Sequence, residues 1–75
     1  MMKIEVNLND IEACREIRKK YGDSKVPFFG QNDKGEDVII SVNKDNITVE
    51  TFQTNGWIRT NILWDDGLSE ELYDR

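Results

Sequence analysis

Residues 57–64 have a pattern that a strand can use, and we expect the other strands to pair in register with this segment. Because successive side chains of a strand point to opposite faces, Ile58, Ile62 and Trp64 would share one face. The alternate positions, which would share the other face, are Trp57, Arg59, Asn61 and Leu63. Turn-forming residues flank the segment on both sides. The pattern therefore predicts a central strand.

Turn-forming pairs recur every ten or eleven residues, at Lys34-Gly35, Lys44-Asp45, Asn55-Gly56 and Asp66-Gly67. Such regular spacing indicates an antiparallel meander. With two-residue loops at the first three pairs, Ile40 lies between Phe29 and Val49, and Val49 pairs with Ile62. This register gathers apolar residues on one inner face: Phe29, Val38, Ile40, Val42, Ile47, Val49, Ile58, Ile62 and Trp64. Because a slip of one residue turns a strand over, the agreement among the hairpins favours this register.

Residues 9–21 predict an amphipathic helix. Asn9 is a suitable N-cap, and Gly22 is a suitable residue to end the helix. One stripe of the helix is apolar and consists of Ile11, Cys14, Ile17 and Tyr21. Residues 2–8 have the pattern of a strand, and a right-handed crossover through the helix would make them a parallel neighbour of residues 25–31. The helix is the predicted element that covers the inner face.

The last segment, residues 68–75, fits two patterns. A three-residue loop over 65–67 would make it a strand that pairs Leu72 with Thr60, whereas Ser69 could also cap a short helix. We favour the strand. The expected fold class is α+β: one small domain over residues 1–75, with an N-terminal helix packed on one face of a five- or six-stranded, mostly antiparallel sheet in a β-α-β-β-β-β meander. A small half-open barrel is the competing shape.

The predicted register also defines an open face that one helix cannot cover. The candidate partner-binding residues on it are Trp57, Arg59, Phe52, Ile39, Leu63 and Phe28. Aromatic residues and arginine dominate binding hot spots, and contiguous apolar patches mark interaction sites. The sequence therefore predicts a non-enzymatic protein–protein interaction module that uses this face or a sheet edge, with another protein or a second copy in a homodimer as partner.

Composition narrows the chemistry that the chain can perform. It has 75 residues, no histidine and one cysteine, Cys14, which we expect to pack in the core. Nucleophilic catalysis that depends on histidine is therefore excluded, and the acidic clusters lack the spacing of a calcium loop. The glycines are spaced as turns and not as a phosphate-binding loop. We expect no enzymatic activity, no cofactor and no metal site.

Fifteen acidic and ten basic residues give a net charge of −5, which disfavours nucleic acid as a partner. One alternative function is a small acidic inhibitor, of the kind that phages and other mobile elements encode, which imitates nucleic acid through Asp65, Asp66, Glu70 and Glu71. A second alternative is a single-stranded nucleic-acid binder that stacks bases on the aromatic face. The chain contains no apolar run of signal-peptide or bilayer length, so we expect a cytoplasmic protein without a membrane partner.

Overall fold

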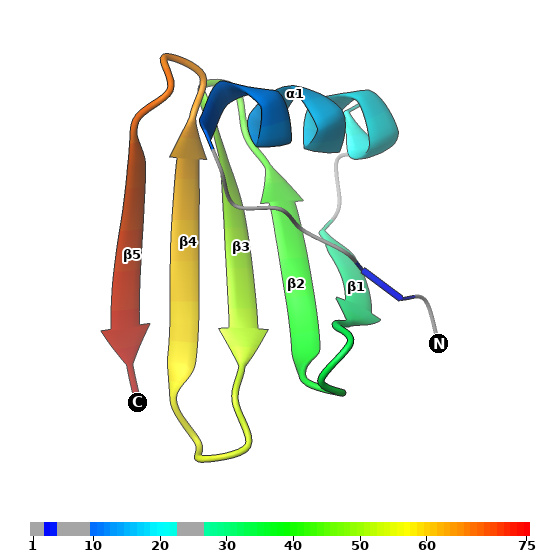
Figure 1. The fold of residues 1–75 in the computed structure, drawn as a ribbon, viewed down its shortest axis with the longest axis vertical. Coiled ribbons are helices and arrows are strands. Elements are labelled where there is room, and N and C mark those ends of the chain that lie inside the picture. Colours follow the sequence, from blue (N-terminus) through cyan, green and yellow to red (C-terminus); the bar gives the residue numbers. More distant parts are fainter. Residues whose placement is uncertain (1–2, 5–9, 23–26) are drawn as a thin grey trace.

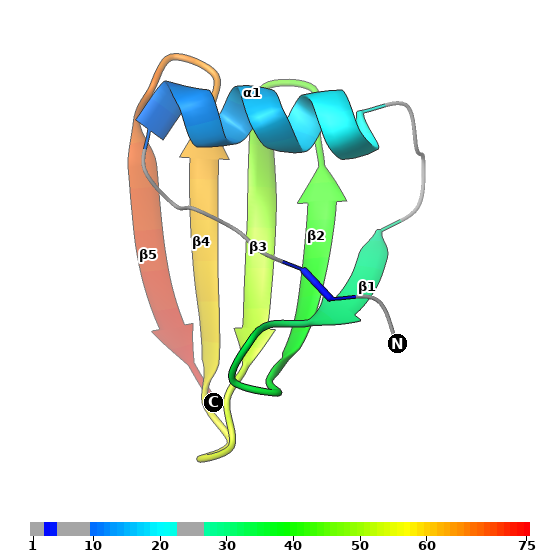
Figure 2. The ribbon, with the colours of Figure 1, turned by 45° about the vertical axis from the view of Figure 1, so that its right-hand side comes forward.

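The computed structural model describes residues 3–4, 10–22 and 27–75. Its elements, in chain order, are α1 (Asp10–Tyr21), β1 (Phe28–Gln31), β2 (Asp37–Val42), β3 (Asn46–Phe52), β4 (Ile58–Trp64) and β5 (Ser69–Asp74). The strands form one antiparallel sheet in the order β1-β2-β3-β4-β5 (Figure 1). Helix α1 crosses one face of the sheet near the ends of the strands (Figure 2). The predicted α+β fold is confirmed, as is the strand, and not a helix, over the last residues.

Helix α1 matches the predicted helix in extent, and three residues of the predicted apolar stripe, Cys14, Ile17 and Tyr21, are buried; the side chain of Ile11 lies outside the described part. Its buried side chains, each at most 8% exposed, are Ala13, Cys14, Ile17 and Tyr21. Arg18, Lys19 and Lys20 lie in the last turn, where positive charge favours the helix dipole. The predicted N-cap, Asn9, lies outside the described residues. Packing of one apolar stripe against the sheet is what stabilises a helix this short.

The predicted N-terminal strand over residues 2–8 falls mostly outside the described residues, which here are Lys3 and Ile4 alone. Lys3 forms an isolated parallel bridge with Gln31, and the backbone N–H of Ile4 donates to the carbonyl of Gln31 at 2.7 Å. The side chain of Ile4 is only 1% exposed and belongs to the core. This bridge agrees with the expected parallel contact between the N-terminal segment and β1.

The core lies between α1 and the sheet. On the sheet side, its most buried residues are Val38, Ile40, Ile47, Val49 and Leu63. Each of these side chains stabilises the fold by about 1.5–3 kcal/mol through removal of apolar surface from water. Two polar residues of the same face, Thr51 and Asn61, are also buried.

Three of the four hairpin loops share one geometry, in which three residues end in a glycine with positive φ. These glycines are Gly35 (φ 79°), Gly56 (φ 88°) and Gly67 (φ 95°). In the loop between β3 and β4, Gln53 N donates to Trp57 O at 2.9 Å, and Gly56 N donates to Gln53 O at 3.1 Å. The remaining loop, between β2 and β3, has two residues, because Asn43 N donates directly to Asn46 O at 2.8 Å.

This loop geometry corrects the predicted register. Two-residue loops at Lys34-Gly35 and Asn55-Gly56 were wrong, because each glycine is the third residue of a three-residue loop. The structure instead pairs Ile47 with Leu63, and Phe28 with Ile40. A slip of one residue turns a strand over, so β1 and β4 present the opposite faces from those predicted, and β5 is turned over together with β4. The residues predicted on the inner face but found on the other are Phe29, Ile58, Ile62 and Trp64. The registers of β2 with β3 and of β4 with β5 are as predicted.

Candidate functional site

The outer face is the side of the sheet away from α1, and cross-strand pairs arrange its side chains in rows. One row consists of Gln31, Asp37, Phe52, Ile58 and Asp74. The next consists of Phe29, Ile39, Glu50, Thr60 and Leu72, and the third of Ser41, Thr48, Ile62 and Glu70. Beyond them, Trp64 N donates to Leu68 O at 2.8 Å and closes the β4–β5 hairpin.

Apolar side chains occupy the outer face without a covering element among the residues that the structure describes. The most exposed are Phe29 at 62%, Leu68 at 66% and Leu72 at 51%. Half-buried side chains fill the space between them: Ile39, Phe52, Ile58, Ile62 and Trp64. Single exposed apolar residues are ordinary, but a contiguous group that spans five strands is typical of an interaction surface.

The charged residues of the outer face are acidic. Asp37, Glu50, Glu70 and Asp74 lie on it, and no lysine or arginine of β1–β5 does. Among the described residues outside these strands, Lys3 is bridged to Gln31 and lies at the margin beyond β1. Along its strands the face therefore combines apolar area with charges of one sign, and these charges favour positively charged partners.

A hollow of about 350 Å³ lies on this face at the β1–β3 end. Phe29, Ile39 and Phe52 form apolar walls. The carboxylate of Asp37 also lines the hollow, and its Oδ1 accepts a hydrogen bond from Gln31 Nε2 at 3.3 Å. An apolar hollow with one fixed polar group is the usual form of a site that binds a single side chain or a small ligand.

The structure separates the six predicted partner-binding residues. Ile39 and Phe52 lie on the outer face, as predicted. Leu63 is 2% exposed in the core, and the ring of Phe28 packs on Tyr21 with centroids 4.5 Å apart. Their placement on an open face was therefore wrong, and the cause is the register of β1 and β4. The hydrophobic pattern of β4 does not show which face is buried, because both of its faces carry apolar residues.

Trp57 and Arg59 lie on the helix side of the sheet, at the end that α1 does not cross, and not on the outer face. Arg59 contacts Glu71, with Nε and Oε1 3.5 Å apart, and its guanidinium lies 5.7 Å from the ring centroid of Tyr73. The guanidinium of Arg75 lies 5.0 Å from the ring centroid of Trp57. These side chains form a second patch of two arginines and two rings, in which sequence reasoning had missed Tyr73 and Arg75.

Gln53 supports the position of Arg59 within this patch. With its amide group oriented so that the oxygen faces the guanidinium, Gln53 accepts hydrogen bonds from Arg59 Nε at 3.0 Å and Nη2 at 2.8 Å. Arg59 is thus held by the amide of Gln53, from the β3–β4 connection, and by the carboxylate of Glu71 and the ring of Tyr73, both from β5. Its donors are largely engaged within the chain.

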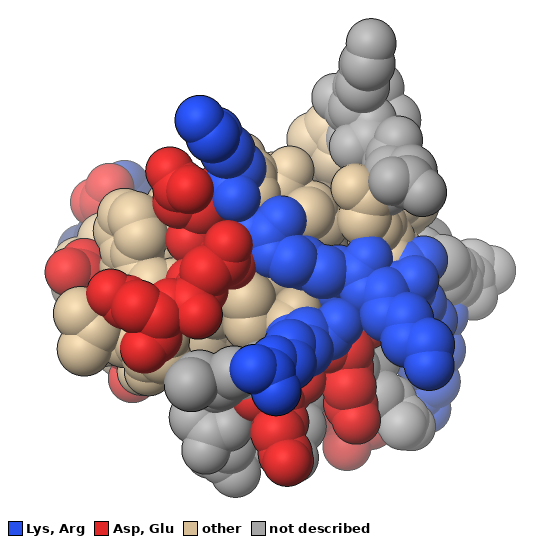
Figure 3. Space-filling model, turned by 90° about the horizontal axis from the view of Figure 1, so that it is seen from above, with Lys and Arg blue, Asp and Glu red and all other residues tan. Residues whose placement is uncertain are grey.

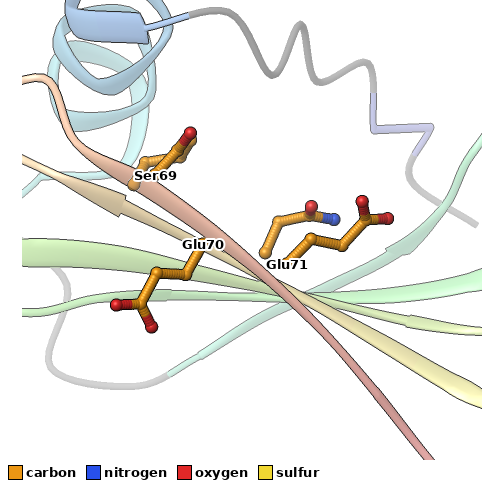
Figure 4. A pocket seen from close by; sticks show the side chains of 5 residues that line it. Ser69, Glu70 and Glu71 are labelled. Atoms are coloured by element: carbon orange, nitrogen blue, oxygen red, sulfur yellow. The ribbon is translucent and has the colours of Figure 1, made fainter.

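The four acidic residues proposed as a nucleic-acid mimic do not form one surface. Asp65 is engaged by Arg18, with Oδ1 2.9 Å from Nη2 and 3.0 Å from Nε. Along β5, Glu71 and Ser69 point to one side and Glu70 points to the other (Figure 4). At the helix end of the molecule, lysine and arginine side chains gather over α1 beside aspartate and glutamate side chains (Figure 3). Acidic charge is therefore divided among several surfaces.

Arg18 connects α1 to two loops of the sheet. Its Nη2 donates to the carbonyls of Asn43 at 2.7 Å and Lys44 at 3.1 Å, while Nε donates to Asp65. Cys14 lies beneath this contact, and its Sγ donates to Asp65 Oδ1 at 3.3 Å. Burial raises the pKa of the Cys14 thiol, and the hydrogen bond to Asp65 raises it further. A thiol in this environment stays protonated at neutral pH and packs as a small apolar group.

A second hollow, of about 340 Å³, is lined by Asn61, Leu63, Ser69, Glu70 and Glu71 (Figure 4). Within the described part of the chain, Asn61 Nδ2 is buried and has no hydrogen-bond partner. The described residues contain no group of three or more carboxylates or thiols placed to hold a metal ion. They also contain no helix of the length and apolar character that crossing a bilayer requires.

Comparison with known proteins adds no family to this description. No protein-family model matches the chain, and neither a curated protein nor a solved structure matches it significantly.

Proposed function

We propose that this chain is a non-enzymatic protein-interaction module that binds its partner through the outer face of the sheet. The observation that carries the proposal is the apolar group on that face, where Phe29, Leu68 and Leu72 are more than half exposed. Covering such side chains removes apolar surface from water at about 25 cal/mol per Å². Binding of a partner that covers this face is therefore favourable, because it buries apolar side chains that no described element of the chain covers.

The chemistry of the sheet edges favours the face over an edge as the binding surface. Strand β5 is one edge of the sheet, and three of its six residues are acidic: Glu70, Glu71 and Asp74. Charged side chains on an edge strand oppose the addition of another strand. At the other edge, the backbone of β1 already bonds to Ile4 through Gln31.

Charge also favours a different protein over a second copy as the partner. If two outer faces stacked on each other, the charged strand residues of both copies would all be acidic: Asp37, Glu50, Glu70 and Asp74. No strand residue of opposite charge would be present on either face to pair with them. Like charges brought together in an interface cost several kcal/mol, about the gain from burying two or three apolar side chains. A symmetric face-to-face homodimer is thus the less favourable form of the proposal.

The proposal is tested by capture of partners on two immobilised double variants. Phe29→Ser with Leu72→Ser changes the outer face at exposed positions, and Trp57→Ser with Tyr73→Ser makes a matched change on the helix side. We expect a partner captured from the native host's lysate by the wild type to be lost with the first variant and retained with the second. Circular dichroism establishes that both variants are folded. Equal capture by all three proteins contradicts the proposal.

A second candidate function, single-stranded nucleic-acid binding, is favoured by the patch on the helix side. Its rings and guanidiniums, from Trp57, Arg59, Tyr73 and Arg75, are the groups on which bases stack. The test is anisotropy of a fluorescent oligothymidine at low salt, with Tyr73→Ala and Arg75→Ala expected to abolish binding; no binding by the wild type dismisses this candidate. The acidic-inhibitor alternative has less support, because Asp65 is engaged by Arg18 and the other acidic residues are dispersed.

A further inference from the structure

We infer that the hollow at the β1–β3 end of the outer face binds an arginine side chain from a positively charged segment of the partner protein. The inference rests on the proposed function, because it names the chemistry of the partner that the outer face takes. Two separate observations support it: the composition of the hollow itself, and the sign of the charges on the rest of the face.

The walls of the hollow match the stem and the plane of an arginine. Phe29 and Phe52 contribute rings and Ile39 an aliphatic side chain, around a volume of about 350 Å³ that admits a long side chain. Arginine packs its methylene stem on apolar surface, and its flat guanidinium stacks on aromatic faces. Lysine has a compact, strongly hydrated charge and lacks this planar contact, so the aromatic walls favour arginine.

Asp37 supplies the charge that the guanidinium requires. Its carboxylate lines the hollow, and Gln31 Nε2 contacts Oδ1 at 3.3 Å. Among the contacts of the described residues, Asp37 has no ion-pair partner within the chain. A carboxylate with an open oxygen at the end of an apolar hollow is placed to accept the forked hydrogen bonds of a guanidinium.

The rest of the outer face also favours positively charged residues in the partner. Glu50 lies beside Ile39 and Thr60 in the middle of the sheet, and Asp74 pairs with Ile58 at the β5 side. A segment that crosses the strands would meet both apolar side chains and carboxylates. The complementary sequence has apolar residues interspersed with arginine or lysine, one arginine of which enters the hollow.

Two of the four arginines of a second copy, Arg18 and Arg59, are less suitable occupants of the hollow. Arg18 is engaged by Asp65 and loop carbonyls, and Arg59 is engaged by Gln53 and Glu71. Each would have to give up these contacts to enter the hollow of another molecule. Because two of the chain's four arginines are engaged in this way, and because a second outer face would bring further acidic residues to the interface, we assign the arginine to a different protein.

The test uses two fluorescent 15-residue amphipathic peptides with the same apolar positions, one with arginines and one with neutral citrullines in their place. Binding to the full chain is measured by anisotropy and mapped by amide chemical shifts. We expect the arginine peptide to bind about tenfold or more tightly than the citrulline peptide, because charge-assisted hydrogen bonds contribute to only one of them. The shifts should centre on Phe29, Ile39 and Phe52.

A matched pair of variants tests whether the carboxylate of Asp37 binds the arginine peptide. Asp37→Asn removes the carboxylate of the hollow, while Asp33→Asn removes the same charge from the exposed turn of the same hairpin. We expect Asp37→Asn to weaken binding of the arginine peptide about tenfold and Asp33→Asn to change it by less than about twofold. Equal effects of the two variants, equal affinity of the two peptides, or shifts confined to the helix side would overturn the inference.

The outcome remains distinct from that of the proposed function. If the peptides bind equally but the Phe29→Ser, Leu72→Ser variant still loses its lysate partner, the outer face is an interface and the arginine assignment is wrong. If that variant retains its partner, the proposed function fails whatever the peptides do. Light scattering of the wild type adds one more outcome: self-association that Asp37→Asn reverses would overturn the assignment of the arginine to a different protein.

Discussion

The two faces of the sheet differ in how far their apolar residues are buried. Facing α1, the strands present branched aliphatic side chains, such as Ile40 and Ile47, which are fully buried. Facing outward, they present the rings of Phe29, Phe52 and Trp64 among aliphatic and acidic residues. The centre of the first face is buried and carries no charge. The second face is partly exposed to solvent and carries negative charge.

This difference separates the residues that fold the chain from those available for binding. Small branched side chains interdigitate in a closed core, where they lose little rotamer freedom. Rings expose large rigid surfaces at low entropic cost, which suits an open face that awaits a partner. The comparison therefore predicts that equivalent changes on the two faces have unequal effects on stability.

The largest expected effect comes from a pair of matched truncations. Ile47→Ala removes a fully buried side chain next to α1 and should cost about 2–5 kcal/mol of unfolding free energy. Ile62→Ala truncates a half-buried side chain of the outer face and should cost roughly 1 kcal/mol. Urea unfolding followed by circular dichroism measures both. Equal losses would mean that the outer face is as much a part of the core as the inner one.

The next largest effect is expected for Arg18, whose hydrogen bonds hold α1 against the loops of the sheet. Arg18→Ala removes the hydrogen bonds to Asn43, Lys44 and Asp65 and should cost about 1–3 kcal/mol. Lys19→Ala, at an exposed position of the same turn, should change stability by less than about 0.5 kcal/mol. If the two substitutions are equivalent in urea unfolding, α1 is held by its apolar stripe alone.

The loop that decides which side of β4 faces α1 should tolerate substitution less well than its exposure suggests. A Cβ at Gly56 would meet nothing within 4 Å, but the residue has a φ of +88°. Gly56→Ala should therefore cost about 1–2 kcal/mol through backbone conformation alone. Gly56→Asn should cost less, because asparagine adopts left-handed conformations more readily. Similar midpoints for the two variants in thermal unfolding would contradict this explanation.

The smallest effect concerns the thiol beneath α1 and appears as a dependence on pH. Because burial raises the pKa of Cys14 in the folded state, the unfolded state loses that proton first as the pH rises. The free energy of unfolding should thus decline above about pH 8.5, the usual pKa of a free thiol. The decline from neutral to alkaline pH should be shallower in Cys14→Ala. The measurement is urea unfolding at several pH values. If the unfolding free energy declines equally with pH in both proteins, folding does not raise the pKa of Cys14.

The sequence contained strong local signals for some elements and ambiguous ones for others. The helix and the β2–β3 hairpin follow from an apolar stripe and from the two-residue loop at Lys44-Asp45, so both were predicted correctly. Asn55-Gly56 suits a two-residue turn, and it equally suits the end of a three-residue loop. Residue type alone does not decide between the two, because glycine has a positive φ in each.

The error in the candidate site followed directly from that ambiguity. Ile39 and Phe52 come from strands whose mutual register was correct, and they lie on the outer face. Leu63 and Phe28 come from strands that were turned over, and they lie in the core. A consistent rule was available, since the correctly predicted loop at 65–67 also ends in glycine. Applied to residues 33–35 and 54–56, the same rule places every strand on its observed face.

The order of the strands in the sheet has a consequence for how the chain folds. Neighbouring strands in space are also neighbours in sequence, and each pair is joined by a loop of only two or three residues. Closing such short loops costs little chain entropy, so successive hairpins form by short-range zipping. Among the described residues, the docking of α1 and the bridge from Lys3 to Gln31 bring more distant parts of the chain together, which makes them the expected late events on the path to the native state.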